Sequence, residues 1–337
     1  MRLWILFSLL LLFVGCNKSN FSPITADKSS PRSRNLSASG VICAIAFSRD
    51  GKEFVAIVNH HVEKWDAKTW RLKSTSKGKI LNCNHARFSP DLKEVATVGF
   101  ERFEPGNFTI WNVADGRVLM KLIAHRDAGC FIAPVFSHGG ELIVGGAENS
   151  TVIWDVTKKE MLWSKFSDGI TMPPAIAFTR DDSKLIESGR NIILIRDVKT
   201  GDIIRKINIG ENSEISCLDI SPDDSTMAVN QGIYDKKGVP EQYIDLINTY
   251  SGKWIKKIRV NDSSITFILF SPDGRSVITG DEANSVNVWN VRNGSLVGRF
   301  TNNGKVLQQV ALDPDGKQIA CVYTGGEIRV WEMKKYF

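Results

Sequence analysis

The feature that most constrains the fold of this chain is a motif that occurs seven times. Each copy is an apolar run ending in Phe-Ser-Pro-Asp-Gly or a close variant, at residues 47–51, 88–91, 136–139, 178–181, 220–223, 270–274 and 312–316. A second motif follows each copy: Trp65-Asp66, Trp111-Asn112, Trp154-Asp155, Arg196-Asp197, Ile247-Asn248, Trp289-Asn290 and Trp331-Glu332. The second motifs are spaced by 46, 43, 42, 51, 42 and 42 residues. Such a period indicates one structural unit stacked on copies of itself.

Each unit resolves into four short strands. In the sixth repeat we expect them at residues 265–270, 276–279, 285–289 and 295–300, with turns at 272–274 and 293–294. The third of these strands alternates, with Val286 and Val288 on one face. A four-stranded blade has two apolar faces, and a ring of seven blades buries both against neighbours. The sequence therefore predicts an all-β, seven-bladed β-propeller.

These repeats resemble those of the WD-repeat (WD40-type) β-propeller family in length, in the Trp-Asp ending and in strand order, over residues 33–337. The family often fixes each blade with a buried His–Ser/Thr–Asp–Trp hydrogen-bond network. Its aspartate lies six residues before the tryptophan, where this chain has Asn59, Pro105, Glu148, Arg190, Glu241, Ala283 and Gly325. We therefore expect divergent blades that are held chiefly by packing, and a structural role for His125.

The last repeat ends after its third strand, so the ring needs a fourth strand from elsewhere. Residues 34–40 precede the first repeat as residues 71–77 precede the second. We expect residues 33–38 to complete the seventh blade, which would leave no open sheet edge between the two ends of the ring.

The N-terminus has the pattern of an export signal. A short positive start, Met1-Arg2, precedes an apolar run of 12 residues that ends in Phe13-Val14-Gly15-Cys16. The run is too short to span a bilayer but suits a signal-peptide core. The ending resembles the lipobox of bacterial lipoproteins, although Phe13 stands where that family usually has leucine. The resemblance implies cleavage before Cys16 and attachment of lipid to it.

Three regions follow from these patterns: a lipoprotein signal peptide at 1–15, a flexible tether at 16–32 and the propeller at 33–337. The tether is rich in Ser, Asn, Pro and Lys and has no apolar period. We expect the chain to be anchored by lipid to a membrane of the bacterial cell envelope. Asn17 after the lipidated cysteine favours the outer membrane where aspartate at that position is the inner-membrane retention signal.

The remaining titratable residues show no metal or catalytic pattern. Five further cysteines lack the Cys-x-x-Cys spacing of metal sites, and we expect buried free thiols, with a disulfide in an oxidising compartment as the alternative: they are Cys43, Cys83, Cys130, Cys217 and Cys321. His60 and His61 are adjacent, and adjacent strand residues point to opposite faces. We expect no metal, no cofactor and no catalytic residue. The net charge of +6 forms no basic stripe, so no nucleic-acid partner is expected.

Two repeats carry insertions between their second and third strands, at residues 101–107 and 231–240. In a propeller these connections share one face with the links between blades, and binding residues concentrate in such loops. We therefore expect a partner-binding face that contains Arg102, Phe103, Glu104, Tyr234, Lys236 and Lys237.

The sequence favours a monomeric, membrane-tethered, non-enzymatic scaffold that binds a protein or peptide through this face. Two alternatives remain open. One is a periplasmic propeller enzyme of the lactonase, dehydrogenase or quinoprotein type, which would need polar ligands converging on the central channel. The inner strands here are mostly apolar, as at residues 42–46. The other is an envelope-assembly lipoprotein related to the eight-bladed propellers of outer-membrane biogenesis.

Overall fold

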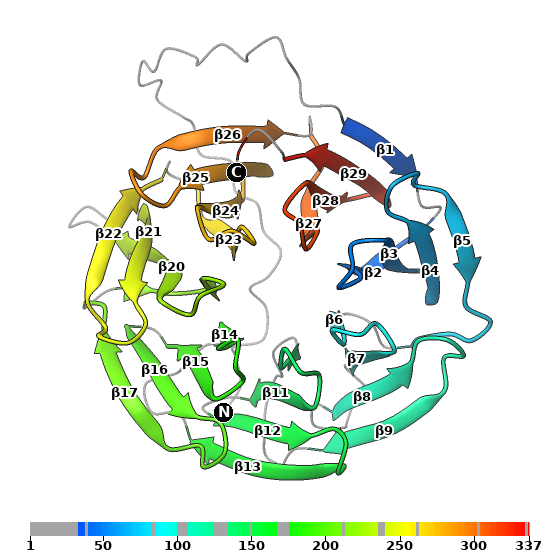
Figure 1. Cartoon of the computed structure of the whole chain (residues 1–337), viewed down its shortest axis with the longest axis horizontal. Coiled ribbons are helices and arrows are strands. Elements are labelled where there is room, and N and C mark those ends of the chain that lie inside the picture. The colour runs from blue at the N-terminus through cyan, green and yellow to red at the C-terminus, as the bar shows by residue number, and fades with distance from the viewer. Residues whose placement is uncertain are drawn as a thin grey trace, which may run out of the picture. The chain divides into compact units, whose positions relative to one another are not determined.

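The computed structural model describes residues 33–37, 40–81, 85–99, 107–123, 134–147, 150–166, 175–189, 191–210, 213–234, 240–260, 263–301, 304–333 and 336. They fall within one compact unit, Arg32–Phe337. Seven antiparallel sheets radiate from a central axis, which confirms the seven-bladed propeller (Figure 1). None of the described segments forms a helix of the length and apolarity needed to cross a membrane.

The strands of each blade are given from the innermost to the outermost. Blades 1 to 3 are β2 (Ile42–Phe47), β3 (Glu53–Val58), β4 (His61–Asp66), β5 (Leu72–Thr75); β6 (His85–Phe88), β7 (Glu94–Gly99), β8 (Asn107–Asn112), β9 (Val118–Ile123); and β10 (Val135–Phe136), β11 (Leu142–Ala147), β12 (Ser150–Asp155), β13 (Glu160–Phe166). Blades 4 and 5 are β14 (Ile176–Phe178), β15 (Lys184–Ser188), β16 (Ile192–Asp197), β17 (Ile203–Asn208); and β18 (Ser213–Glu214) with β19 (Leu218–Ile220), β20 (Thr226–Tyr234), β21 (Pro240–Asn248), β22 (Trp254–Arg259). Blades 6 and 7 are β23 (Ile265–Phe270), β24 (Ser276–Asp281), β25 (Ser285–Asn290), β26 (Leu296–Thr301); and β27 (Leu307–Leu312), β28 (Gln318–Tyr323), β29 (Glu327–Glu332), β1 (Ser33–Ser37).

The ring is closed by its two ends, as the sequence predicts. β1 pairs antiparallel with β29, from Ser33 opposite Trp331 to Ser37 opposite Glu327 (Figure 1). The N-terminal strand thus supplies the fourth strand of blade 7. Because β1 begins where β29 ends, it starts on the face that carries the Phe-Ser-Pro-Asp-Gly turns, which we call the turn face. The opposite face, with the links between blades and the β7–β8 and β20–β21 connections, is the loop face.

The recurring motif forms a hydrogen-bonded turn. In blade 6 the Ser271 hydroxyl donates to Asp273 at 2.6 Å and accepts the Ser276 N–H at 2.9 Å, while Gly274 adopts a φ of 70°. Equivalent bonds in blades 1 and 4 lower the pKa of Asp50 and Asp181 to about 2, because hydrogen bonds to the charged carboxylate favour it. The Phe-Ser-Pro-Asp-Gly motif therefore supplies the side chains that form this turn, and it recurs because each blade contains the turn.

The core lies between blades. Phe54 and Val58 of blade 1 pack with Ala320, Val322 and Ile328 of blade 7 in one buried cluster. All six residues of β24 are buried. Each blade therefore covers an apolar face of its neighbour, and a propeller sheet of this kind is not stable alone.

Buried hydrogen bonds add to the packing that was expected to be the chief support of the blades. Trp111 donates to the Thr97 hydroxyl at 2.8 Å, and Trp289 donates to Thr279 at 2.9 Å. These are the Trp–Thr half of the polar network that the sequence suggested was lost. The register places each threonine opposite the residue two before the tryptophan, a pairing that the spacing of the motifs did not reveal.

One of the described cysteines differs from the expected free thiols. Cys43 is disulfide-bonded rather than free. Cys217 and Cys321 carry free thiols, and burial raises the pKa of both, to about 12 for Cys321. Cys83, Cys130 and His125 lie outside the described residues.

Candidate functional site: the loop face and the central channel

Most of the residues predicted to bind a partner lie outside the described part of the chain. These are Arg102, Phe103, Glu104, Lys236 and Lys237, and the lipidation candidate Cys16 is among the undescribed residues as well. Tyr234 is described through its backbone alone, as the last residue of β20. Their roles stay predictions.

The insertion of blade 5 is a hairpin rather than a loop over most of its length. β20 and β21 are nine residues long, and their pairing continues from Gln231 opposite Tyr243 to Tyr234 opposite Pro240. β18 adds a third partner, with Ser213 opposite Ile233. The sequence reading of residues 231–234 as loop was therefore wrong, because insertion length alone does not distinguish a loop from two extended strands. In blade 2, likewise, Asn107 belongs to β8 and pairs with Gly99.

Buried polar contacts fix the base of this hairpin. The Gln231 amide donates to the Ile209 carbonyl at 2.7 Å and to the Ser213 hydroxyl at 2.8 Å. The Lys257 ammonium of the outer strand donates to the side-chain oxygen of Gln231. The same ammonium lies over the Tyr243 ring, 4.3 Å from the ring centroid. Buried polar groups with satisfied partners restrict movement. The hairpin that carries Tyr234 is thus held from both sides.

A buried carboxylate supports the same region. The side chain of Asp245 is fully buried, accepts a bond from Trp254 at 3.1 Å and lies 3.9 Å from the Lys257 ammonium. Burial raises the pKa of Asp245, and the bond from Trp254 and the charge of Lys257 act in the opposite direction. We assign these contacts a structural role, because they face the blade interior and not the channel.

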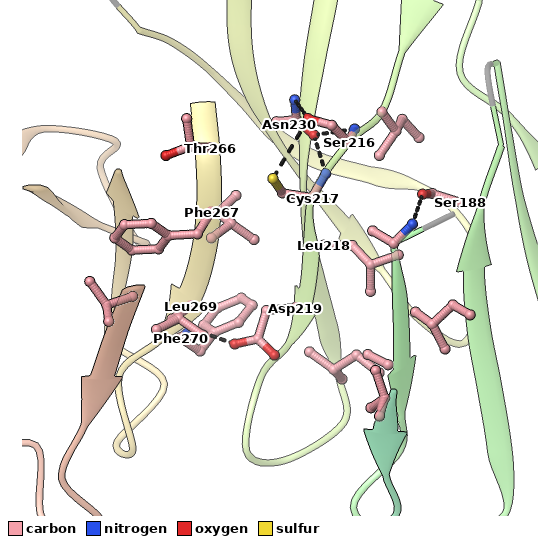
Figure 2. A pocket seen from close by; sticks show the side chains of 18 of the residues that line it. Ser188, Ser216, Cys217, Leu218, Asp219, Asn230, Thr266, Phe267, Leu269 and Phe270 are labelled. Atoms are coloured by element: carbon pink, nitrogen blue, oxygen red, sulfur yellow. Dashed lines mark hydrogen bonds between the residues drawn. The ribbon is translucent and has the colours of Figure 1, made fainter. Parts of the chain in front are cut away.

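The central channel is a cavity of about 1070 Å³ lined mainly by blades 3 to 7. Figure 2 shows part of this wall, with Asn230, Ser216 and Cys217 at one level and Asp219 beside Phe270 at another. Asn230 accepts the Ser216 and Cys217 N–H groups at 2.8 and 2.7 Å, and so fixes the entrance to β19. The wall mixes apolar side chains with polar ones such as Ser188, Thr266 and Gln309, so it is more polar than the mostly apolar inner strands led us to expect.

Two charged side chains stand out in the channel. Asp219 accepts the Phe270 N–H at 2.6 Å, and burial raises the pKa of Asp219 to about 6. The Arg87 side chain reaches the channel from blade 2, and its hydrogen bond goes to the Ala86 carbonyl at 3.3 Å. Surrounding protein lowers the pKa of Arg87, but arginine keeps its charge in proteins.

Hydrogen bonds join successive turns on the turn face. Asp182 accepts the backbone N–H groups of His138 and Gly139 at 2.8 and 2.7 Å. Asp224 accepts the Arg180 N–H at 2.8 Å in the same way. These carboxylates join blade to blade, so they have structural partners.

The two adjacent histidines have separate backbone partners. His60 and His61 do not lie together on a strand, because His60 has a φ of 72° in the turn before β4. Their rings hydrogen-bond to the Ile80 and Ser76 carbonyls. No group of three His, Cys, Asp or Glu residues arranged to hold a metal ion occurs within the described ranges.

Comparisons with known proteins agree with this architecture. Residues 252–290 match the family model "WD domain, G-beta repeat". These findings support a WD-repeat family. Among curated relatives, Autophagy-related protein 16 of Arabidopsis thaliana is 22% identical over 85% of this chain and 46% of its own length. Transcription factor unc-37 of Caenorhabditis elegans is 21% identical over 79% of this chain and 43% of its own length. Apoptotic protease-activating factor 1 of Rattus norvegicus is 25% identical over 47% of this chain and 13% of its own length. The chain thus spans less than half the length of these WD-repeat relatives.

Proposed function

We propose that this chain is a non-enzymatic WD-repeat scaffold that binds a protein or peptide partner through its loop face. The observation that carries the proposal is the extended β20–β21 hairpin of blade 5. Its base is fixed by Gln231, Ser213 and Lys257, so the paired residues 231–234 need little further ordering when a partner binds. Relatives such as transcription factor unc-37 support a role in protein interaction.

The proposal includes a lipid anchor on Cys16 and a place in the bacterial cell envelope. The disulfide at Cys43 supports an oxidising compartment, where such bonds persist. Because β1 starts on the turn face, the preceding tether joins the propeller on that side. The loop face would then point away from the membrane, toward a partner.

Affinity capture from detergent-solubilised membranes tests the partner-binding role. A triple variant, Tyr234→Ala with Lys236→Glu and Lys237→Glu, is expected to lose the partner captured by the wild type. A matched variant on the turn face, Lys199→Glu with Lys253→Glu, should keep it. Capture that survives the hairpin changes, or that is lost with the turn-face variant instead, would contradict the proposal.

Membrane fractionation tests the anchor. Cys16→Ser removes the acyl attachment, and the protein should move from the membrane fraction to the soluble fraction. A Cys16→Ser protein that stays with the membrane would show that the tether does not depend on lipid at this cysteine. Labelling with hexadecanoic acid then serves as the independent check.

A further inference from the structure

One position of the inner strands separates two blades from the other five. It is the residue directly before the apolar residue that begins each turn motif. Five blades have a small or apolar residue there: Ala46, Val135, Ala177, Leu269 and Ala311. Blade 2 has Arg87 and blade 5 has Asp219. Both belong to inner strands, and both line the central cavity.

The strand registers place these two charges at the same depth. Arg87 lies one residue from the end of β6, where Phe88 pairs with Val95, and Asp219 lies one residue from the end of β19, where Ile220 pairs with Met227. Blades 2 and 5 are three blades apart in a ring of seven, so they form opposite walls (Figure 1). No ion pair joins Arg87 to Asp219 across the channel.

Neither charged group forms a salt bridge with the described side chains, although the charge of His138 acts favourably on the Asp219 carboxylate. Asp219 accepts the backbone N–H groups of Phe270 and Ile220, and Figure 2 shows its carboxylate beside Phe270, but no cationic side chain is bonded to it. A carboxylate has about four acceptor positions, so the Asp219 carboxylate can accept further hydrogen bonds. Arg87 has five N–H donors and uses one on the Ala86 carbonyl. Asp219 is partly buried and Arg87 is exposed within the channel, so both keep hydrogen-bonding capacity that a ligand of opposite charge can use.

The other charged groups on the cavity wall are engaged elsewhere or lie at its ends. At the turn face, Arg180 and Asp224 bond to each other through the Arg180 backbone, and His138 bonds to Asp182. Glu214 lies at the loop-face end, in β18. Between these ends, the other lining residues that the structure describes are apolar or uncharged, such as Thr266 and Gln309.

We propose that the central channel binds a small dipolar molecule, a short peptide or similar zwitterion, with its carboxylate at Arg87 and its ammonium group at Asp219. The cavity of about 1070 Å³ suits a ligand of a few residues. Guanidinium and carboxylate groups form strong charge-assisted hydrogen bonds with these two ends. This channel site is separate from the loop face, and the proposal does not depend on partner binding at the loop face.

Isothermal titration calorimetry of the purified full-length protein with di-, tri- and tetra-alanine tests the proposal. At least one unmodified peptide should bind, and N-acetylation or C-amidation should each weaken it tenfold or more. Arg87→Gln and Asp219→Asn should weaken the unmodified peptide to a similar degree. The amidated peptide should be insensitive to Arg87→Gln, and the acetylated one to Asp219→Asn.

An exposed pair on a turn serves as the matched control. Arg275→Gln and Asp273→Asn remove the same charges from blade 6 outside the cavity, and they should leave binding unchanged. The proposal fails if no unmodified peptide binds. It also fails if both end modifications leave the affinity of the wild type intact, a result that does not depend on how well the variants fold.

Discussion

The guanidinium of Arg196 forms an ion pair with the carboxylate of Glu187 in the interior of blade 4, where the two side chains are 3% and 0% exposed. Blades 2 and 6 have a hydrogen-bonded tryptophan and threonine at the same two positions. Thr151 of blade 3 donates to Glu187, and Arg196 also donates to the Gly201 carbonyl at 2.9 Å. The ion pair therefore takes over the role of the Trp–Thr bond and adds a link to the preceding blade, blade 3.

Breaking this pair on one side should destabilise the protein strongly. Glu187→Gln or Arg196→Met leaves one buried charge without its partner, which typically costs about 3–5 kcal/mol of unfolding free energy. The double change Arg196→Trp with Glu187→Thr restores the pairing of blades 2 and 6 and should recover most of the loss. Denaturant unfolding measures the effect. Single variants within about 1 kcal/mol of the wild type would show that the pair adds little.

The closing strand should matter more than its length suggests. Deletion of residues 1–39 removes β1 and leaves the outer edge of β29 unpaired. Such an unpaired edge favours association between molecules. We expect a lower Tm, by roughly 5 °C or more, and a concentration-dependent increase in size by gel filtration. Deletion of residues 1–32 keeps β1 and is the control. Equal behaviour of the two truncations would mean that the ring does not depend on β1.

The fold could be predicted from the sequence because its main cause is local and repeated. The turn motif fixes where each inner strand ends, and the Trp-Asp motif fixes each third strand, so the blades and the closing strand follow. The pairing of buried polar side chains inside the blades could not be predicted in the same way. The pairing of Arg196 with Glu187 depends on register, and register is decided by packing of the whole sheet.

The candidate sites divide similarly. The insertion of blade 5 was visible, but its conversion into strands depends on the Gln231 contacts with Ile209 and Ser213, which come from another part of the chain. The disulfide at Cys43 also needs spatial proximity. The Arg87 and Asp219 pair had a sequence signal that was missed: alignment of the seven turn motifs shows two charged residues in a column of apolar ones.

Stability should depend on pH through Asp219 in a direction unusual for an aspartate. Burial raises the pKa of Asp219 from 3.8 to about 6, so the folded protein holds this proton more firmly than the unfolded chain. The resulting stability is fully present below about pH 4 and is lost as pH rises through about 6. Relative to wild type, Asp219→Asn should therefore gain up to about 3 kcal/mol between about pH 4 and pH 7. Parallel pH curves would contradict this.

The base of the hairpin should loosen when its amide is removed. Gln231→Met keeps the size of the side chain but removes the amide that bonds to the Ile209 carbonyl, Ser213 and Lys257, at a cost of about 1–3 kcal/mol. Amide hydrogen exchange should rise at residues 231–234 and stay unchanged in blade 1. Gln308→Met changes an exposed glutamine and is the control. Unchanged protection at residues 231–234 would argue against a fixed hairpin.

Site-specific photo-crosslinking tests the central claim most directly. A photoreactive phenylalanine analogue is placed at Tyr234 on the hairpin, at Lys237 beyond it, and at Lys199 on the turn face as the comparison. The proposed scaffold should crosslink one discrete protein partner in cells from positions 234 and 237 and none from position 199. Crosslinks to that partner from the turn face, or from none of the three positions, would contradict partner binding through the loop face.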